Sequence, residues 1–288
     1  MIYRVDYVLA VIFAGMLVGA LLSRRTSRIE PRQLARGYFV VVGVLLVFRA
    51  VDFVCGIVLP NASVWNTIGA AIGDVGGFFF GAIFGIAARR TERREILCDP
   101  AIYSALCLSV GVGFVMAGMV KAFYMNGMIE FFTQSGYSTP FLKFIMVTEV
   151  LGGIGLLIPW TVLPAIAGLS IDMFGAIYTH IHNGDPVNDS TGAIGMLIRL
   201  GAIVALWAWR PRSGEPGNSA RLRFAVGGMG MAVCIGAAVA GSALMRYVSR
   251  PLATPKSNSR SFGSSDTWPH IGRGQGVCYD TEQKGIPI

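Results

Sequence analysis

The sequence predicts an all-α protein, a polytopic membrane bundle of about eight transmembrane helices. Hydrophobic residues fill 53% of the 288 positions and charged residues only 14%, whereas soluble domains carry about a quarter charged residues. Thirteen of the twenty arginines lie in three short clusters, and linkers without Lys or Arg alternate with them. An arginine excess in every second loop is the positive-inside pattern of an integral membrane protein, with those loops in the cytoplasm. The clusters are Arg24, Arg25, Arg28, Arg32 and Arg36, then Arg89, Arg90, Arg93 and Arg94, then Arg210, Arg212, Arg221 and Arg223.

A membrane-spanning helix needs about 20 apolar residues, and eight segments of the chain meet that requirement. We interpret the first as a retained helix rather than a signal peptide, because Ser-Arg-Arg follows it instead of a small-residue cleavage site. With the arginine loops inside, both termini are predicted to lie outside the cytoplasm. The expected spans are 5–23, 37–59, 66–88, 101–124, 141–160, 162–181, 190–209 and 224–245.

The formal net charge of +8 comes from basic residues that flank these spans, which indicates control of topology rather than nucleic acid binding. The five cysteines show no CxxC, CxxCH or Cys/His ligand spacing, so the sequence predicts no metal site and no c-type haem. Cys55 and Cys278 both fall on the predicted outer side, where a disulfide between them can persist.

The third expected span carries a glycine at every fourth position, and this spacing places the glycines in one narrow stripe along a helix. Repeats of small residues let another helix approach closely inside a membrane. The stripe either packs within the same chain, which we favour, or docks a partner subunit. Its members are Gly69, Gly73, Gly77, Gly81 and Gly85.

Three ionisable residues lie at one depth on three successive later spans. Counted from the outer helix ends, Glu149, Asp172 and Arg199 are roughly 12–14 Å deep at 1.5 Å per residue, so they can form one cluster. Charges inside a span are costly and usually face the bundle interior. Two interpretations stay open: an ion pair that holds helices in register, or a proton path or quinone headgroup site with one carboxylate in excess.

The first half of the chain offers a second cluster at matching depth. Arg49 and Asp52 are three residues apart and share a helix face, and Asp74 on the next span can meet them. We favour a structural role for this cluster over a functional one.

A further group surrounds the outer mouth of the later helices and consists of Lys121, Lys143, Tyr178, His180 and His182. The two lysines can extend to the interface. The two histidines point in different directions on a helix, so they make a poor chelating pair. One of them titrates near neutral pH if it lines a pocket, and ordinary boundary chemistry is the alternative.

From about 101 to 209 the chain resembles the DoxX family of four-helix membrane proteins, on short motifs in the family's order and spacing. The connecting segment 125–140 has the pattern of an interfacial segment lying over the bundle. Ala101-Ile102-Tyr103 stands where family members usually carry an arginine. The matching motifs are Ala117-Gly118-Met119-Val120-Lys121, Phe131-Phe132 with Gly136, Glu149-Val150-Leu151-Gly152-Gly153 and His182-Asn183-Gly184, with His180 or His182 as the matching histidine.

The resemblance implies a redox-associated subunit of the bacterial inner membrane. It marks Lys121, Glu149 and His180 or His182 as the catalytic candidates. A quinone is the implied cofactor, and Asp172, Arg199 and Tyr178 are the residues we expect to bind it. No flavin, haem or iron–sulfur ligation pattern is present, so electrons would come from a partner subunit. The alternatives are a non-catalytic assembly or anchoring subunit and, third, a small-solute or proton transporter.

The resemblance also divides the chain. We expect an N-terminal three-helix membrane segment at 1–97 and a DoxX-like four-helix bundle at 98–210. A cytoplasmic loop and final transmembrane helix follow at 211–245, and a flexible extracytoplasmic tail rich in Ser, Pro and Gly at 246–288.

Overall fold

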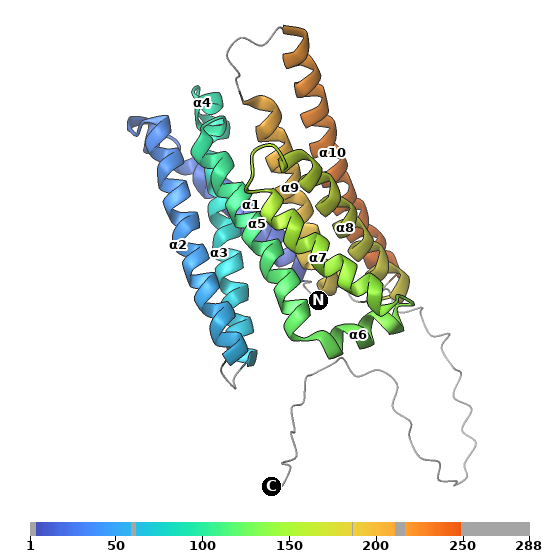
Figure 1. Ribbon diagram of the computed structural model, residues 1–288. Coiled ribbons are helices and arrows are strands. Elements are labelled where there is room, and N and C mark those ends of the chain that lie inside the picture. The colour runs from blue at the N-terminus through green and yellow to red at the C-terminus, as the bar shows by residue number, and fades with distance from the viewer. Residues whose placement is uncertain (1–3, 59–61, 186, 211–216, 249–288) are drawn as a thin grey trace, which may run out of the picture. The chain divides into compact units, whose positions relative to one another are not determined.

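The computed structural model describes residues 4–58, 62–185, 187–210 and 217–248, and every element in them is helical (Figure 1). Each expected span coincides with one helix. These helices are α1 (Arg4–Leu22), α2 (Pro31–Val58), α3 (Ala62–Arg89), α5 (Pro100–Phe123), α7 (Thr139–Gly155), α8 (Val162–Asn183), α9 (Thr191–Trp209) and α10 (Gly217–Val248). Two shorter helices, α4 (Arg93–Leu97) and α6 (Met125–Gln134), and two 3₁₀ turns, Thr26–Arg28 and Val187–Ser190, lie between them.

Five helical segments are long and apolar enough to cross a membrane by length and composition. They are Pro31–Gly56, Ile68–Arg89, Pro100–Phe123, Val162–Asn183 and Thr191–Trp209. Tyr7–Leu22 and Gly228–Gly241 are shorter apolar segments, and α7 has 17 residues, so the total of eight spans stays a prediction.

Large apolar side chains point outward from these helices, as a lipid solvent permits and water does not. Leu21 is 77% exposed, and Val58 and Ile171 are each 71% exposed. The core of the bundle runs along α9, where Leu197, Leu200 and Ile203 are completely buried.

The C-terminal part of the glycine stripe packs against α1. A Cβ added at Gly81 would overlap the carbonyl oxygen of Ile12, and one at Gly85 would overlap the carbonyl oxygen of Met16. Only glycine leaves room for so close an approach of two helix backbones. These two positions of the stripe therefore contact a helix of the same chain.

Two glycines of α1 repeat this arrangement from the other side. Gly15 lies against the backbone of Phe78, and Gly19 lies against the backbone of Ala82. Because residue numbers rise together in both helices, α1 and α3 are parallel. Helices separated by a single span must run in the same direction, so this pairing agrees with alternating crossings.

The rest of the stripe has different surroundings. Gly77 faces the side chain of Ile12, and a Cβ at Gly73 would meet nothing within 4 Å. Gly69 lies beside α2, at a position described with the candidate site. The stripe is thus not one continuous docking face.

Two arginine loops meet at one end of the bundle. The Arg90 guanidinium donates from Nη1 to the carbonyl oxygen of Ile29, 3.0 Å away, so it links the loop after α3 to the loop after α1. Its Nε donates to Glu92, and the Nε–Oε2 distance is 3.2 Å. The Cys98 thiol lies 3.3 Å from the carbonyl oxygen of Trp209, at the end of α9. The loops before α2, before α5 and after α9 therefore lie on one side.

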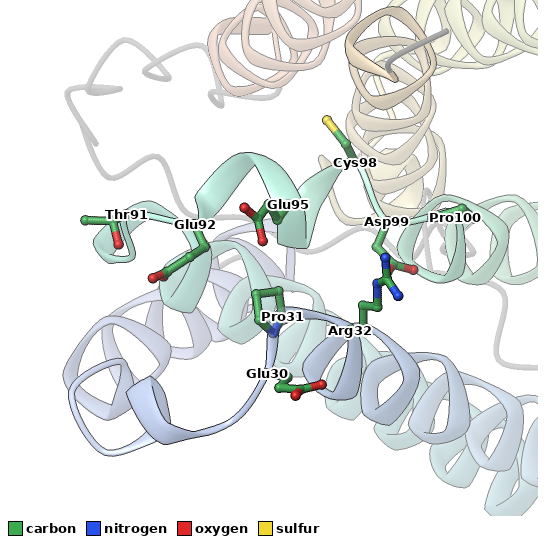
Figure 2. Close-up of a pocket in the computed structure, with 9 residues that line it drawn as sticks. All are labelled: Glu30, Pro31, Arg32, Thr91, Glu92, Glu95, Cys98, Asp99 and Pro100. Carbon is green, nitrogen blue, oxygen red and sulfur yellow. The ribbon is translucent and has the colours of Figure 1, made fainter. Parts of the chain in front are cut away.

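A polar pocket of about 650 Å³ opens between these loops, and Figure 2 shows its lining side chains. Glu30, Glu92, Glu95 and Asp99 contribute carboxylates, and Arg32 contributes a cation. Asp99 also begins α5, because its Oδ1 accepts a hydrogen bond of 2.8 Å from the backbone N–H of Ala101. The acidic lining thus partly serves helix capping.

The C-terminal predictions extend beyond the described residues. The tail at 249–288 lies outside them, and so does Cys278. Helix α10 runs to Val248, so the first residues assigned to the tail are helical. Cys55 forms no disulfide with any described residue, and its pairing with Cys278 stays a prediction.

Candidate functional site

Lys121 and Glu149 form a buried ion pair between α5 and α7. The Lys121 ammonium lies 2.6 Å from Oε1 and 2.5 Å from Oε2 of Glu149. The Glu149 side chain is 3% exposed and the Lys121 side chain 22% exposed. Lys121 stands in the last turn of α5, where the helix dipole favours a cation. The structure thus joins two of the catalytic candidates directly.

Close packing of α5 on α7 makes this contact possible. A Cβ at Gly153 would lie 2.6 Å from the carbonyl oxygen of Gly111, and one at Gly111 would lie 2.7 Å from the carbonyl oxygen of Gly153. About two turns farther along α5, and nearer Lys121, a Cβ at Gly118 would lie 3.0 Å from the carbonyl oxygen of Met146. Residue numbers rise in α5 as they fall in α7, so these helices are antiparallel. The motif glycines therefore bring the two backbones close enough for the lysine to reach the glutamate.

Two further glycines of α7, Gly152 and Gly155, let this helix pack closely against α8. A Cβ at Gly152 would lie 2.6 Å from the side chain of Leu169, and one at Gly155 would lie 3.0 Å from the Cβ of Ala165. This packing positions Asp172, farther along α8, within electrostatic range of the Lys121–Glu149 pair. Two carboxylates and one ammonium are therefore grouped between α5, α7 and α8.

One oxygen of the second carboxylate lacks a hydrogen-bond partner among the described residues. Asp172 Oδ2 is buried and accepts no hydrogen bond within the part of the chain that the structure describes. Buried polar atoms are normally satisfied, so such an atom calls for a proton, a water molecule or a ligand. We name Lys121, Glu149 and Asp172 the carboxylate–lysine site.

Arg199 does not supply the cation of this cluster. Its electrostatic neighbour is the hydroxyl of Tyr38 on α2, whereas Lys121 is the cation beside Asp172 and Glu149. The expected Glu149/Asp172/Arg199 grouping is thus replaced by Lys121, Glu149 and Asp172. Counting residues from a helix end gives the height of a side chain and leaves its direction around the helix axis open.

The first-half cluster consists of Arg49 and Asp52. Arg49 Nη1 lies 3.2 Å from Asp52 Oδ2, and Asp52 is 7% exposed. A Cβ at Gly69 of α3 would overlap both polar atoms, so the glycine makes room for the pair. Among the described residues, no hydrogen bond or ion pair connects Asp74 to either partner. The helix that faces the pair thus contributes Gly69 rather than Asp74.

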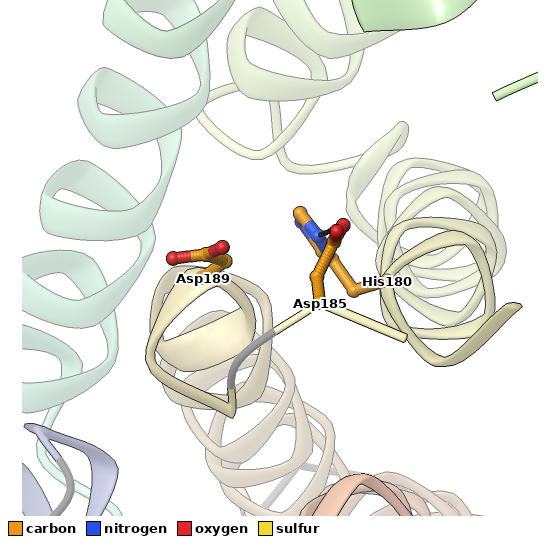
Figure 3. A group of neighbouring side chains, drawn as sticks. All are labelled: His180, Asp185 and Asp189. Carbon is orange, nitrogen blue, oxygen red and sulfur yellow. Dashed lines mark hydrogen bonds and ion pairs between the residues drawn. The ribbon is translucent and has the colours of Figure 1, made fainter. Parts of the chain in front are cut away.

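The two histidines, His180 and His182, have different neighbours at the end of α8. Gly184 adopts the left-handed conformation with φ 71°, and the Asp185 N–H donates to the carbonyl oxygen of His180 at 3.0 Å. This turn closes the helix and returns the Asp185 side chain to His180, with Oδ2 2.8 Å from Nδ1 (Figure 3). His180 is therefore oriented by a carboxylate that sequence reasoning did not select.

His182 and Tyr178 lie apart from that contact. Their rings stack with centroids 6.0 Å apart and an angle of 12° between planes, and both side chains are exposed. Lys143 is exposed as well. None of the three has a described hydrogen bond or ion pair to the carboxylate–lysine site.

Helix α6 and the turn after it are held to α8 by polar contacts. The Tyr137 hydroxyl lies 3.0 Å from the Thr179 hydroxyl, and Asn183 donates from Nδ2 to the Ser135 hydroxyl at 2.9 Å. No residue of α6 itself is buried. The connecting segment therefore lies at the C-terminal end of α8, beside the His180–Asp185 contact.

The charged neighbours of Asp189 are also His180 and Asp185. Partial burial raises the pKa of Asp189; His180 opposes this shift and Asp185 adds to it. Sequence reasoning missed Asp185 and Asp189. The glycine that closes α8 just before Asp185 was the available signal.

A second pocket, of about 670 Å³, lies at the arginine-loop end. Its lining includes Tyr103, Trp207, Arg210 and Pro159, and the Arg210 guanidinium carbon lies 4.9 Å from the centroid of the Tyr103 ring. Neither this pocket nor the polar one includes a residue of the carboxylate–lysine site.

Residues 105–209 match the DoxX-like family. The match runs from the second turn of α5 to the end of α9, and it confirms the resemblance over that part of the chain. No curated protein and no solved structure matches the chain. With its apolar helices, the protein is an all-α integral membrane protein that contains a DoxX-like segment.

Proposed function

We propose that this protein is a quinone-associated subunit of a membrane redox complex, and that the carboxylate–lysine site binds the quinone headgroup. We place it in the bacterial inner membrane, with the arginine loops in the cytoplasm and both termini outside. The positive-inside pattern supports this orientation. The DoxX-like match over 105–209 supports the redox association.

The observation that carries the proposal is the unsatisfied carboxylate oxygen of Asp172 beside a buried ion pair. A structural ion pair needs only Lys121 and Glu149, whose charges cancel. Asp172 adds a second negative charge without a second cation among its electrostatic neighbours. A buried carboxylate in excess is typical of sites that take up or release protons.

The three side chains have complementary roles in such a site. The Lys121 ammonium has three N–H donors, and one that is not directed at Glu149 can donate to a quinone carbonyl. Two carboxylates with one ammonium leave one negative charge, and a neighbouring like charge favours the protonated form of a carboxylate. Asp172 and Glu149 can therefore take up and pass on protons. Reduction of a quinone to a quinol consumes two electrons and two protons. The electrons come from a partner subunit, as the chain has no recognisable ligation pattern for a redox cofactor.

The test measures quinone retained by the purified full-length protein in native lipid nanodiscs, as the ratio of quinone to phospholipid by mass spectrometry. The variants are Asp172→Asn, which keeps the shape of the side chain, and Lys121→Met combined with Glu149→Gln, which removes the pair together. Lys143→Gln is the matched control, because it removes an exposed lysine.

We expect the wild type and Lys143→Gln to be enriched in quinone over the bulk membrane. We expect both site variants to fall to the bulk ratio. A wild-type ratio equal to that of the membrane would overturn the proposal. If a partner complex then co-purifies and stays active with Asp172→Asn, the assembly role holds instead; flux into proteoliposomes lost in that variant would indicate transport.

A further inference from the structure

The end of α8 gathers three metal-ligating side chains. One ligand atom from each of His180, Asp185 and Asp189 lies within 4.8 Å of the others. Figure 3 shows His180 and Asp185 pointing toward one another, with Asp189 on the neighbouring turn. His180 comes from α8, Asp185 from the closing turn and Asp189 from the 3₁₀ turn Val187–Ser190.

The spacing of these atoms suits a small divalent ion. The 2.8 Å between His180 Nδ1 and Asp185 Oδ2 is close to the separation of about 3 Å between adjacent ligands whose bonds to an ion are about 2.1 Å long. A hydrogen bond between the imidazole and the carboxylate has the same length, so this distance agrees with either arrangement. Asp189 is exposed, so its side chain is free to rotate and complete the set.

The group is rich in oxygen ligands. Two carboxylates stand beside one imidazole, and the linker 182–189 contains no Lys or Arg. The charged neighbours of Asp189 are the other two members of the group. Each of the two carboxylates offers one oxygen ligand to a divalent cation, and the imidazole offers one nitrogen.

A second observation comes from the residues directly after Asp189. Ser190 is completely buried, and its hydroxyl has no hydrogen-bond partner within the described ranges. The hydroxyl of Thr191 has none there either. Buried hydroxyls are normally satisfied, and a water molecule bound to an ion at the neighbouring group would supply a missing partner.

We propose that His180, Asp185 and Asp189 bind a divalent transition-metal ion at the end of α8. One imidazole nitrogen and two carboxylates suit zinc, manganese or ferrous iron. The ion would fix the turn after α8 to the helix, beside the α6 segment that Asn183 and Thr179 already hold. The search for Cys/His spacing missed the site because two of its ligands are aspartates. The proposal is independent of the quinone site.

The test uses the full-length protein in nanodiscs, with any affinity tag removed and bound metal stripped by a chelator. Titration with Mn²⁺, followed by the electron paramagnetic resonance signal of the unbound ion, counts saturable sites. The variants are His180→Asn, Asp185→Asn and Asp189→Asn. His182→Asn is the matched control, because this histidine lies two residues away and stacks on Tyr178.

We expect one saturable site in the wild type and in His182→Asn. Each ligand variant should bind at least about tenfold more weakly, in line with the losses seen for altered metal sites. Wild type without saturable binding, or all variants binding equally, would overturn the proposal. Thermal unfolding without metal separates lost ligands from misfolding: a variant that unfolds like the wild type yet loses binding supports the site. If Asp185→Asn is itself unstable, Asp189→Asn decides, since Asp189 is exposed.

Discussion

Gly111 and Gly153 face each other across α5 and α7, each so close to the other's carbonyl oxygen that neither position has room for a Cβ. This contact lies on the same helix pair as the Lys121–Glu149 ion pair. The approach of the backbones sets the distance that the lysine side chain has to cover. Gly111 lies about three turns from Lys121 along α5, and Gly153 lies about one turn from Glu149 along α7. A change at either glycine therefore acts on the ion pair.

Gly153→Ala should destabilise the protein by about 1–3 kcal/mol, the usual cost of overpacking, because its Cβ would press on a backbone atom that cannot rotate away. Thermal unfolding in nanodiscs measures the effect. Gly168→Ala on α8 is the control, since a Cβ there meets nothing within 4 Å. It should be neutral or stabilising by up to about 1 kcal/mol through helix propensity. Equal stability of the two variants would contradict the close contact.

Lys121→Met alone should cost about 3 kcal/mol, because it leaves the buried Glu149 carboxylate without its cation. This is the lower end of the range for buried pairs, as Lys121 is 22% exposed. Adding Glu149→Gln should restore part of the loss, since the second change removes the stranded charge. A double-mutant cycle of unfolding free energies checks this. Additive losses would mean that the two side chains do not interact.

Gly85→Ala should loosen α1 from α3, because the new methyl group would overlap the carbonyl oxygen of Met16. We expect a clear fall in the midpoint temperature of aggregation. Size-exclusion chromatography after heating measures the fraction of protein that has not aggregated. Gly73→Ala on the same stripe is the control, as nothing lies within 4 Å of its Cβ. If Gly73→Ala lowers the midpoint temperature more than Gly85→Ala does, the stripe has a partner other than α1.

Glu92 should make stability depend on acid pH. Its own backbone N–H lowers the pKa of Glu92 most, then the Thr91 hydroxyl, and Arg90 adds to this, against a small opposing effect of burial. A lowered folded-state pKa means that the ionised carboxylate stabilises the fold above about pH 4.3, the ordinary pKa of Glu. That stability is lost as pH falls through the lowered pKa. Glu92→Gln should therefore flatten the dependence of the unfolding midpoint on pH below about 4.3.

The control for this experiment is Glu95→Gln, which removes a carboxylate from the same pocket. It should leave the acid dependence of the wild type in place. Identical pH profiles for Glu92→Gln and the wild type would contradict the assignment.

The positions of the long helices could be predicted because apolar length and arginine loops are local properties of the chain. Expected and observed ends differ by at most one residue for α1 and α9, but α7 ends at Gly155, five residues before the expected end at 160. Leu156–Trp160 remain apolar there, but Pro159 and the turn that reverses the chain stop the helix. Hydropathy alone does not locate such a stop.

The partners of the buried charges could not be predicted in the same way. Depth counting placed Glu149 and Asp172 at one height, and these two residues do share a site. It also placed Arg199 there, although the electrostatic neighbour of that side chain is Tyr38. Lys121 was assigned to the helix mouth because it is near the end of α5, yet its long side chain extends to Glu149. The direction of a side chain depends on helix rotation, which comes from contacts such as Gly111–Gly153.

The parallel pairing of α1 with α3 has a consequence for how the chain is made. The residues that α1 fits most closely, Phe78 to Gly85, are synthesised only after α2 has been completed. Until then α1 lacks the neighbour that its glycines contact. The pairing of α1 with α3 can therefore form only after the intervening helix has been synthesised, so the N-terminal helices do not associate in chain order.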